Sequence, residues 1–297
     1  MTPLISIVIP HYNGKDILLS CLESLKKIQY KNVKVIVSDD GSTDDSLSTV
    51  KVVFPDIIVL TNKINTGFAA TCNRGIKHAL ELGADYVMLL NNDTVVASDF
   101  LDKMMPAFTD NRCGIAGAKI YYFKKKNLIW YAGGDFIKWR ASGKHRFWQK
   151  ADNKELVGIK DTGFVTGCAM LIKREVLKKI GLFYEPFFLT VEDLDFCSRA
   201  REAGYKNRVA LNAKIWHKVS FSRAGEFSFS NGYYGTRNRL IFAFKRTKNY
   251  TGGLILLFLI LPVRTIMWVA QGKFKMLKGM ILGVVDFFLG REGERIK

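Results

Sequence analysis

Three clusters of acidic and amide residues, each placed where an apolar run ends, are the groups best suited to chemistry in this 297-residue chain. They are residues 38–44 (SDDGSTD), 91–94 (NNDT) and 192–195 (EDLD). The first two follow VKVIV and YVMLL, runs that are typical of buried parallel strands. In an open parallel sheet, the ligand crevice lies at the carboxyl ends of the strands. We therefore predict a metal-assisted nucleotide site at the first two clusters, with a base supplied by the third.

Carboxylate and amide oxygens are the ligands that hard divalent cations prefer, and such a cation can hold a diphosphate and stabilise its departure. Asp93 and the amide oxygen of Asn91 suit that role. Asp39 or Asp40 can accept hydrogen bonds from a base or a ribose. Taken singly, each cluster is equally typical of a turn or a helix cap. Their joint occurrence after two strands is what favours a nucleotide site.

The elements that must position these clusters alternate between strand and helix. Strands are predicted at 4–10, 33–37, 57–61 and 84–90, and helices at 15–28, 46–53 and 71–82. This alternation predicts an α/β fold with a doubly wound, mostly parallel sheet and helices on both faces. Beyond residue 100 the pattern is mixed, with a strand predicted at 164–172 and helices at 174–180 and 192–203.

The charge balance points to an anionic partner, because 45 Lys and Arg face 27 Asp and Glu, a net charge of +18. Residues 237–297 hold twelve of the basic residues and only three acidic ones, interleaved with apolar runs. That mixture suits an anionic membrane surface better than a nucleic acid. We therefore expect no nucleic-acid partner.

The apolar segment 253–270 is interrupted by Pro262 and Arg264, and its uninterrupted core is shorter than the roughly 20 residues of a spanning helix. The segment 276–289 contains Lys278 and Asp286. We predict two interfacial or re-entrant helices, with a helical pair packed on the rest of the protein and a true span as alternatives. The chain then divides into a catalytic domain, 1–225, and a C-terminal membrane-association region, 226–297.

Cysteine usage and the N-terminus suggest the compartment. The five cysteines form no CxxC pair, which is typical of buried free thiols in a reducing compartment. The N-terminal run LISIVIP is too short for a signal peptide and enters a strand pattern at once. We expect a peripheral or monotopic protein on the cytoplasmic face of the cell membrane.

Six stretches of the chain carry a family resemblance. They are ISIVIPHYNG (5–14), VIVSDDGSTDDS (35–46), NTGFAATCNRGI (65–76), YVMLLNNDTVV (86–96), TGCAMLIKREVLKKIGLF (166–183) and FFLTVEDLDFCSRAREAGY (187–205). With them the chain resembles a family 2 glycosyltransferase of the GT-A fold, in the branch that contains rhamnosyltransferases. The resemblance spans most of residues 4–217.

The resemblance implies a role for each matching residue. The donor nucleotide would be bound by Pro10, Tyr12, Asp39, Asp40, Asn65, Gly67, Asn73, Arg74 and Asn92. A divalent metal, Mg or Mn, would be held by Asp93, Asn91 and His217. Here the family's DxD motif is Asn91-Asn92-Asp93, with an amide at the usual first acid. Asp193 matches the catalytic base, supported by Glu192, Asp195 and Arg199, the last two spaced as an i, i+4 ion pair.

The implied reaction is a single displacement, since one base and no protein nucleophile invert the anomeric configuration. The donor would be dTDP-rhamnose or a UDP-hexose. The acceptor would be a saccharide hydroxyl, in cell-surface polysaccharide synthesis. The basic, apolar C-terminus fits an acceptor carried on a polyprenyl diphosphate lipid, because it would dock the protein beside that lipid. The acceptor region would include 117–148, where Tyr121, Tyr122, Trp130, Trp139 and Trp148 either stack on sugars or belong to the core.

Three other classes compete with this reading. A nucleotidyltransferase would carry a glycine-rich basic loop after the first strand, where this chain has His11-Tyr12-Asn13-Gly14-Lys15. A nucleic-acid-binding module would use the basic aromatic stretch 144–150 and has no need of carboxylates at strand ends. A catalytically degenerate scaffold would explain the amides at Asn91 and Asn92, although Asp93 and Asp193 are retained.

Overall fold

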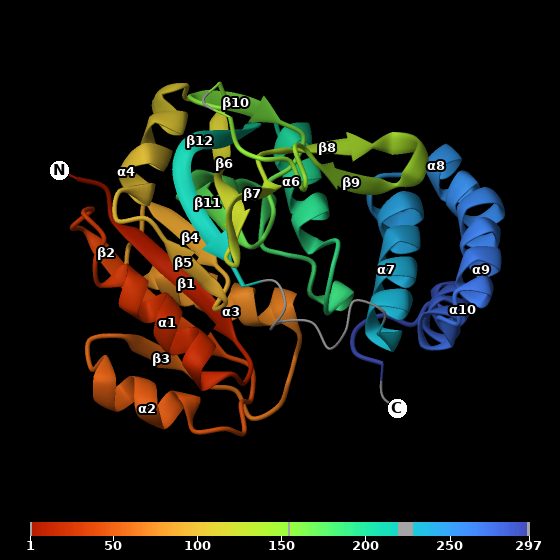
Figure 1. Ribbon diagram of the computed structural model, residues 1–297, viewed down its shortest axis with the longest axis horizontal. Coiled ribbons are helices and arrows are strands. Elements are labelled where there is room, and N and C mark those ends of the chain that lie inside the picture. Colours follow the sequence, from red (N-terminus) through yellow and green to blue (C-terminus); the bar gives the residue numbers. More distant parts are fainter. Residues whose placement is uncertain (1, 154, 219–227, 296–297) are drawn as a thin grey trace.

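The computed structural model describes residues 2–153, 155–218 and 228–295, and Figure 1 shows one central sheet flanked by helices, with a helical group at one end. The main sheet has ten strands, eight of them in the order β10-β12-β6-β11-β4-β1-β2-β3. The N-terminal half is parallel and the C-terminal half mixed. The predicted α/β class, with helices on both faces of the sheet, is confirmed.

The parallel half of the sheet follows from short, mostly apolar runs that end at polar turns. Its strands are β1 (Ile5–His11), β2 (Val33–Asp39), β3 (Ile58–Leu60) and β4 (Tyr86–Leu90). The connecting helices are α1 (Lys15–Leu25), α2 (Ser46–Val53) and α3 (Phe68–Glu81). All seven residues of β1 are buried, as expected for a central strand. Because the order reverses between β1 and β4, the carboxyl ends of these two strands flank a switch point.

The second half of the sheet begins with β11 (Ala169–Lys173), which pairs antiparallel with β4. The other strands are β5 (Thr94–Val96), β6 (Cys113–Tyr122), β7 (Lys125–Tyr131), β10 (Ile159–Thr162) and β12 (Lys206–His217). The strand predicted at 164–172 starts only at Ala169. The Thr166–Cys168 backbone instead turns, and the Cys168 carbonyl accepts a hydrogen bond from the Asn91 N–H at 3.0 Å.

Short helices and a hairpin complete this half. The helices are α4 (Phe100–Met104), η1 (Met105–Thr109), α5 (Arg174–Ile180), η3 (Glu185–Phe187) and α6 (Glu192–Glu202). The strands β8 (Gly134–Ile137) and β9 (Ser142–His145) form a separate hairpin, with η2 (Lys138–Arg140) at its tip. This hairpin extends from the sheet toward the C-terminal helices (Figure 1).

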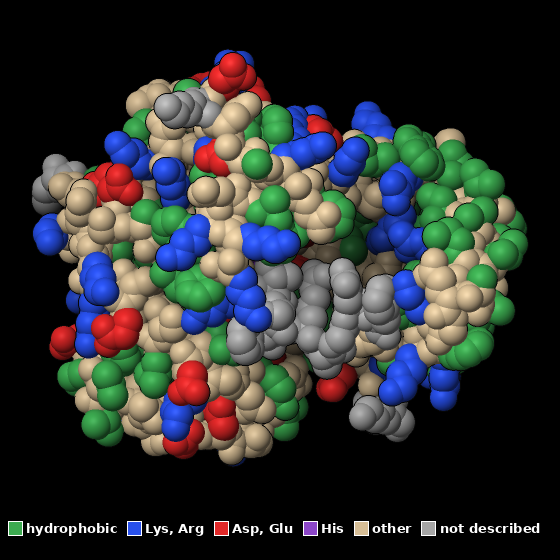
Figure 2. Space-filling model, in the orientation of Figure 1, with side chains coloured by type: hydrophobic (Ala, Val, Ile, Leu, Met, Phe, Trp, Pro, Cys, Tyr) green, Lys and Arg blue, Asp and Glu red, His purple; other side chains and the backbone are tan. Residues whose placement is uncertain are grey.

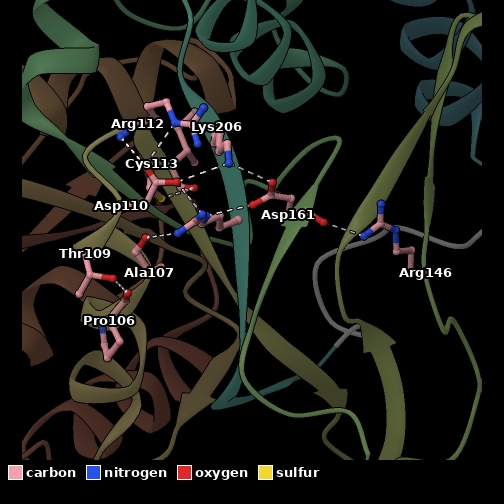
Figure 3. A network of polar contacts seen from close by, with 11 residues as sticks. Pro106, Ala107, Thr109, Asp110, Arg112, Cys113, Arg146, Asp161 and Lys206 are labelled. Atoms are coloured by element: carbon pink, nitrogen blue, oxygen red, sulfur yellow. Dashed lines mark hydrogen bonds and ion pairs between the residues drawn. The ribbon is translucent and has the colours of Figure 1, made fainter.

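An ion-paired cluster, here called the edge cluster, joins the turn before β6 to strands β10 and β12 (Figure 3). The Arg208 Nη2 atom lies 2.7 Å from Asp110 Oδ2, and its Nε lies 3.0 Å from Asp161 Oδ1. Lys206 contacts both carboxylates, at 3.4 and 3.5 Å. Arg146 of the turn after β9 donates to the Asp161 carbonyl at 2.9 Å. The cluster therefore fixes the far edge of the sheet.

The C-terminal helices form a group that we call the helical wing. They are α7 (Phe229–Ile241), α8 (Tyr250–Ile255), α9 (Leu261–Ala270) and α10 (Phe274–Phe288), with π-helical turns at Phe242–Arg246 and Leu256–Ile260. The glycines Gly279 and Gly283 of α10 face the α7 backbone, where an added Cβ would lie 2.3 and 2.7 Å from carbonyl oxygens of α7. Their spacing lets the two helices approach closely.

Residues 250–270 form one continuous helix, although Pro262 and Arg264 lie within it. The π-helical turn at 256–260 ends two residues before Pro262, which lacks the N–H that regular α-helical bonding needs. By length and composition this helix is the one candidate membrane span among the described residues. The sequence analysis judged the uninterrupted apolar core too short to span a membrane, whereas the helix as a whole is long enough by this criterion. The second predicted helix, α10, is separate.

Candidate active site

A cleft of about 690 Å³ opens at the switch point between β1 and β4. Its lining includes eleven of the sequence-predicted residues: Pro10, Tyr12, Asp40, Asn65, Gly67, Asn91, Asn92, Asp93, Glu192, Asp193 and His217. Residues that lie far apart in the sequence therefore meet in one cavity.

Asp40 organises the side of the cleft where the nucleotide is predicted to bind. This carboxylate is 4% exposed and follows the last residue of β2. It accepts hydrogen bonds from the Thr66 N–H at 2.8 Å, the Thr66 hydroxyl at 2.7 Å and the Gly67 N–H at 2.9 Å. Gly67 has a φ of +90°, and a Cβ there would lie 2.5 Å from Phe188. Only glycine fits at that position, so the start of α3 is held against the loop before α6.

Three predicted nucleotide-binding residues do not line the cleft: Asp39, Asn73 and Arg74. The Asp39 carboxylate folds back onto its own loop, where it accepts from the Gly41 and Ser42 N–H groups, each at 3.1 Å. The Arg74 guanidinium donates to the Asp39 carbonyl. Asn73 is buried and joins α3 to the Phe183 backbone, to which it donates at 2.9 Å. Asp39 thus contacts the loop after β2, Arg74 contacts the end of β2, and Asn73 contacts the segment before η3.

The Asn91–Asp93 loop meets the end of β12 at the predicted metal site. Strand β5 pairs with β12, so that Thr94 lies opposite His217. The His217 Nε2 atom lies 3.0 Å from Asp93 Oδ1, and the two side chains are 6% and 1% exposed. The Asn91 Oδ1 atom is also buried and accepts no hydrogen bond from the described residues. A carboxylate, an imidazole and an amide oxygen therefore gather from two strand ends.

This donor set fits a divalent cation that shares its coordination with a substrate. Among the described residues, no group of three or more His, Cys, Asp or Glu side chains could hold a metal ion. Asp93 and His217, with the Asn91 amide, are thus a partial set. Mg²⁺ sites of this kind are completed by substrate phosphates and water. The residues present fit a metal that enters with a nucleoside diphosphate.

His11 is a contributor that the sequence analysis did not select. It is 2% exposed, and its Nδ1 lies 2.8 Å from the Asn92 amide nitrogen, while Nε2 lies 2.9 Å from the Ser46 hydroxyl. Burial lowers the pKa of His11, so the neutral imidazole is favoured. With Asn92 donating to Nδ1, the Nε2–H donates to Ser46. His11 thus orients Asn92. The stretch HYNG (11–14), which lies within one of the segments that carry the family resemblance, was the sequence signal that could have indicated His11.

Asp193 and Glu192 lie at the N-terminal end of α6 and face the cleft. The Asp193 carboxylate accepts from the Gly167 N–H at 3.2 Å and from the Leu194 N–H at 2.8 Å. Burial raises the pKa of both carboxyl groups, and the charge of Asp193 adds to the effect on Glu192. The Glu192 Oε2 atom has no hydrogen-bond partner among the described residues. Since two N–H groups donate to Asp193, its ionised form is the more stabilised of the two, and Glu192 is the carboxyl group that more readily stays protonated.

The supporting ion pair predicted from the i, i+4 spacing is present. Arg199 Nε lies 2.8 Å from Asp195 Oδ2. Arg246, from the helical wing, lies at the same distance from the other oxygen of Asp195. Asp195 is thus neutralised from two sides, outside the cleft.

The remaining wall of the cleft is aromatic. Trp130 and His145 line it, and the Trp130 ring contacts the His217 ring edge-on with centroids 4.6 Å apart. Of the five aromatic residues considered for sugar stacking, only Trp130 lies in the cleft. Tyr121 belongs to the core, and Trp139 and Trp148 are exposed outside it. His145 was missed because it stands in a basic surface-like stretch.

The chain belongs to glycosyl transferase family 2, whose family model matches residues 6–181. An N-acetylglucosaminyl-diphospho-decaprenol L-rhamnosyltransferase of Mycobacterium tuberculosis is 23% identical over 240 residues, which cover 75% of this chain and 78% of that protein. An uncharacterized glycosyltransferase of Rickettsia typhi is 29% identical over 191 residues, 62% of this chain. The chain spans 54% of that relative, and 25% of an uncharacterized protein of Sinorhizobium fredii to which it is 28% identical.

Two solved structures show the same fold. A mannosyltransferase of Pyrobaculum calidifontis, in complex with GDP-Man and Mn²⁺, aligns with a TM-score of 0.62 at 15% identity, over 98% of this chain and 89% of that one. GalNAc-T7 with UDP, GalNAc and Mn²⁺ aligns with a TM-score of 0.58 at 16% identity, over 73% and 44%. The GT-A fold predicted from the sequence is therefore confirmed.

Proposed function

We propose that this chain is a metal-dependent, inverting glycosyltransferase that acts on a saccharide acceptor at a membrane surface. It would transfer a sugar from dTDP-rhamnose or a UDP-hexose to an acceptor hydroxyl. The observation that carries the proposal is the convergence of Asp40, the Asp93–His217 pair and Asp193 on one cleft. Each matches one need of the reaction: nucleotide recognition, diphosphate binding and proton removal.

Asp193 is the proposed base. It would take the proton of the acceptor hydroxyl while that oxygen attacks the anomeric carbon, and the bond from that carbon to the diphosphate oxygen would break on the opposite face. Its raised pKa makes it a stronger base than an exposed carboxylate. A divalent cation would offset the negative charge that develops on the leaving diphosphate. Asp93, His217 and the Asn91 amide would hold that cation.

The lipid-linked acceptor and rhamnose rest on the Mycobacterium tuberculosis relative, whose name specifies both a rhamnosyl transfer and a decaprenol-linked acceptor. The test is direct. The purified protein is incubated with dTDP-rhamnose, UDP-glucose or UDP-N-acetylglucosamine and a synthetic polyprenyl-diphosphate N-acetylglucosamine, with Mn²⁺ or EDTA. We expect a glycosylated lipid in the presence of Mn²⁺ only. Release of no nucleoside diphosphate from any donor would contradict the proposal.

The helical wing is the proposed membrane-association region, and the division at residue 225 remains part of this proposal. Figure 2 shows hydrophobic side chains gathered over the outer helices of the wing. Phe258, Ile266 and Phe288 are 75%, 72% and 68% exposed. The opposite face of the same helices packs inward through Leu256, Leu261 and Trp268. A helix packed along its length on the protein favours lying on a membrane over crossing it.

Basic side chains adjoin this apolar face. Arg264 of α9 lies over the Trp268 ring, 5.7 Å from its centroid. Burial and the charges of Arg264 and Arg140 lower the pKa of Arg239 to about 9. Arg239 itself is 7% exposed and donates to the Ala141 carbonyl, so we expect Arg264 rather than Arg239 to meet an anionic headgroup beside the apolar face.

Vesicle co-sedimentation tests the membrane proposal. We expect binding to phosphatidylglycerol-containing vesicles, weaker binding to pure phosphatidylcholine, and loss of both in a Phe258→Asp, Ile266→Asp double variant. Val52→Asp is a matched control, because Val52 is 80% exposed on α2. A wild-type protein that ignores both vesicle types would contradict this part of the proposal and leave the reaction untouched.

A further inference from the structure

The segment between η3 and α6, residues 188–191, has a strained backbone conformation. Phe188, Thr190 and Val191 have φ angles of +62°, +69° and +77°, a region that favours glycine. Val191 is β-branched, for which this conformation is a genuine outlier. Residues 188–193 all line the cleft, and Asp193 follows this segment as the second residue of α6. The surroundings must therefore fix its conformation.

Two adjacent side chains of α7 supply most of that restraint. Asn238 donates from Nδ2 to the carbonyls of Phe187 and Leu189, both at 2.7 Å, and of Thr190 at 3.2 Å. Arg237 donates from Nη2 to the carbonyls of Pro186 and Phe187, at 3.1 and 3.3 Å. Four carbonyls of one short segment thus point at one pair of side chains.

The pair acts as a unit. Arg237 Nε donates to Asn238 Oδ1 at 3.0 Å, and Nη1 donates to the Tyr233 hydroxyl and to the Gly293 carbonyl. All five N–H donors of the guanidinium are therefore used, and every acceptor is an uncharged oxygen. Arg237 and Asn238 are both 0% exposed. A buried cation is costly, so a side chain kept here only to fill space would be apolar.

The remaining carbonyl of the segment points the other way. The Phe188 carbonyl accepts from the Phe68 N–H, at the start of α3, at 2.8 Å. The segment is thus held between α7 and the loop organised by Asp40. The Val191 carbonyl then accepts from the Asp195 N–H at 3.0 Å, which is the first bond of α6. The conformation of the segment therefore sets where α6 begins and where Asp193 points.

We propose that Arg237 and Asn238 are positioning residues of the transfer reaction, which hold residues 186–190 so that Asp193 faces the cleft. This inference rests on the proposed function, because it takes Asp193 as the base. Helix α7 would then position the active site in addition to any role of the helical wing in membrane association.

The test compares Asn238→Ala and the isosteric Asn238→Asp with Asn249→Ala as matched control. Asn249 caps α8 and also donates to a carbonyl, that of Lys138, but touches neither the segment nor the cleft. The readouts are kcat and KM for Mn²⁺-dependent hydrolysis of dTDP-rhamnose or UDP-glucose, whichever the wild type hydrolyses faster, together with the kcat–pH profile and Tm.

We expect kcat to fall about 10- to 100-fold in both Asn238 variants, as for a base misplaced by a fraction of an ångström to one ångström. KM should change much less, because Asp40 holds the loop of Thr66 and Gly67 independently. Water entering the loosened segment should also lower the pKa of Asp193 and move the acid limb of the profile to lower pH. Asn249→Ala should lower Tm and leave kcat and the limb unchanged.

Equal kcat and pH profiles in Asn238→Asp, Asn238→Ala and Asn249→Ala would overturn the inference and leave the proposed function standing. A wild-type protein that neither binds nor hydrolyses a nucleotide sugar would overturn both. Should Asn238→Ala fail to fold, Asn238→Asp decides the matter, since it opens no cavity.

Discussion

The edge cluster and the cleft each contain a key aspartate, and the surroundings shift the pKa values of the two carboxyl groups in opposite directions. Asp110 of the edge cluster lies next to Arg208 and Lys206, and the Arg112 N–H together with these cations lowers its pKa to about 2. Among the described residues, the hydrogen-bond donors to Asp193 of the cleft are backbone N–H groups, and burial raises its pKa. A carboxylate neutralised by fixed cations stabilises structure. A desolvated carboxylate without one keeps its affinity for a proton and can act as a base.

The largest effect should come from the base itself. Asp193→Asn removes the proton acceptor and leaves the metal site intact, so we expect kcat for sugar transfer to fall by about 10³-fold or more. Donor binding, measured by titration calorimetry with Mn²⁺, should stay within a few-fold of wild type. Near-normal turnover in this variant would place the base elsewhere.

The next effect should come from the metal site. Asp93→Ala removes the carboxylate that faces His217, so we expect the Mn²⁺-dependent part of donor affinity to disappear. The same titration with and without EDTA measures it. Asp110→Ala, which removes a carboxylate of the edge cluster, is the control and should keep the metal dependence.

The dependence of kcat on pH tests the raised pKa of Asp193 in the wild-type protein, without a substitution. A base works as the anion, so kcat should be lost as the pH falls through the raised pKa of Asp193. The acid limb should therefore lie above about 3.9, the ordinary aspartate value. A limb at or below that value would contradict burial as the cause of the raised pKa.

If Asp193 is the base and Glu192 is protonated, a substitution of Glu192 should have a small effect on kcat. Glu192→Gln keeps a neutral, hydrogen-bonding group of the same shape, so we expect kcat within about threefold of wild type if Glu192 already holds a proton. Steady-state kinetics beside Asp193→Asn measures it. A loss as large as that of Asp193→Asn would exchange the two roles.

The smallest effect on catalysis should come from the edge cluster. Asp110→Asn should lower Tm slightly at neutral pH and leave kcat unchanged. Because the folded-state pKa of Asp110 is depressed, its contribution to stability is present above about 3.8 and is lost as the pH falls toward 2. The Tm difference between wild type and variant should therefore shrink over that range.

The parallel half of the fold was predictable because each strand is a short, mostly apolar run that is followed by polar or turn-forming residues. Asp40 and Asp93 could be placed in one site because parallel strands share a carboxyl edge. The β5–β12 pairing that brings His217 to Asp93 has no such local signal, and only the family resemblance indicated it. Trp130 and His145 depend on the hairpin and on β7 in the same way.

The helical wing was less predictable, because burial there does not follow residue type. Arg237 and Arg239 were counted among the charges that suit a membrane surface, but they are 0% and 7% exposed. Asp286 is likewise buried, and it accepts from the Tyr233 hydroxyl at 2.7 Å. Counting charges along a sequence cannot distinguish basic residues on a surface from buried arginines that donate to backbone carbonyls.

The most direct test of the central claim is the thermal stability of the wild type and Asp93→Ala with dTDP, UDP and their sugars, in Mn²⁺ or EDTA. A ligand that binds only the folded state raises Tm by mass action. We expect one nucleotide series to stabilise the wild type in Mn²⁺ only, and Asp93→Ala not at all. Absence of any nucleotide-dependent shift, or an equal shift in both proteins, would contradict the metal-assisted donor site.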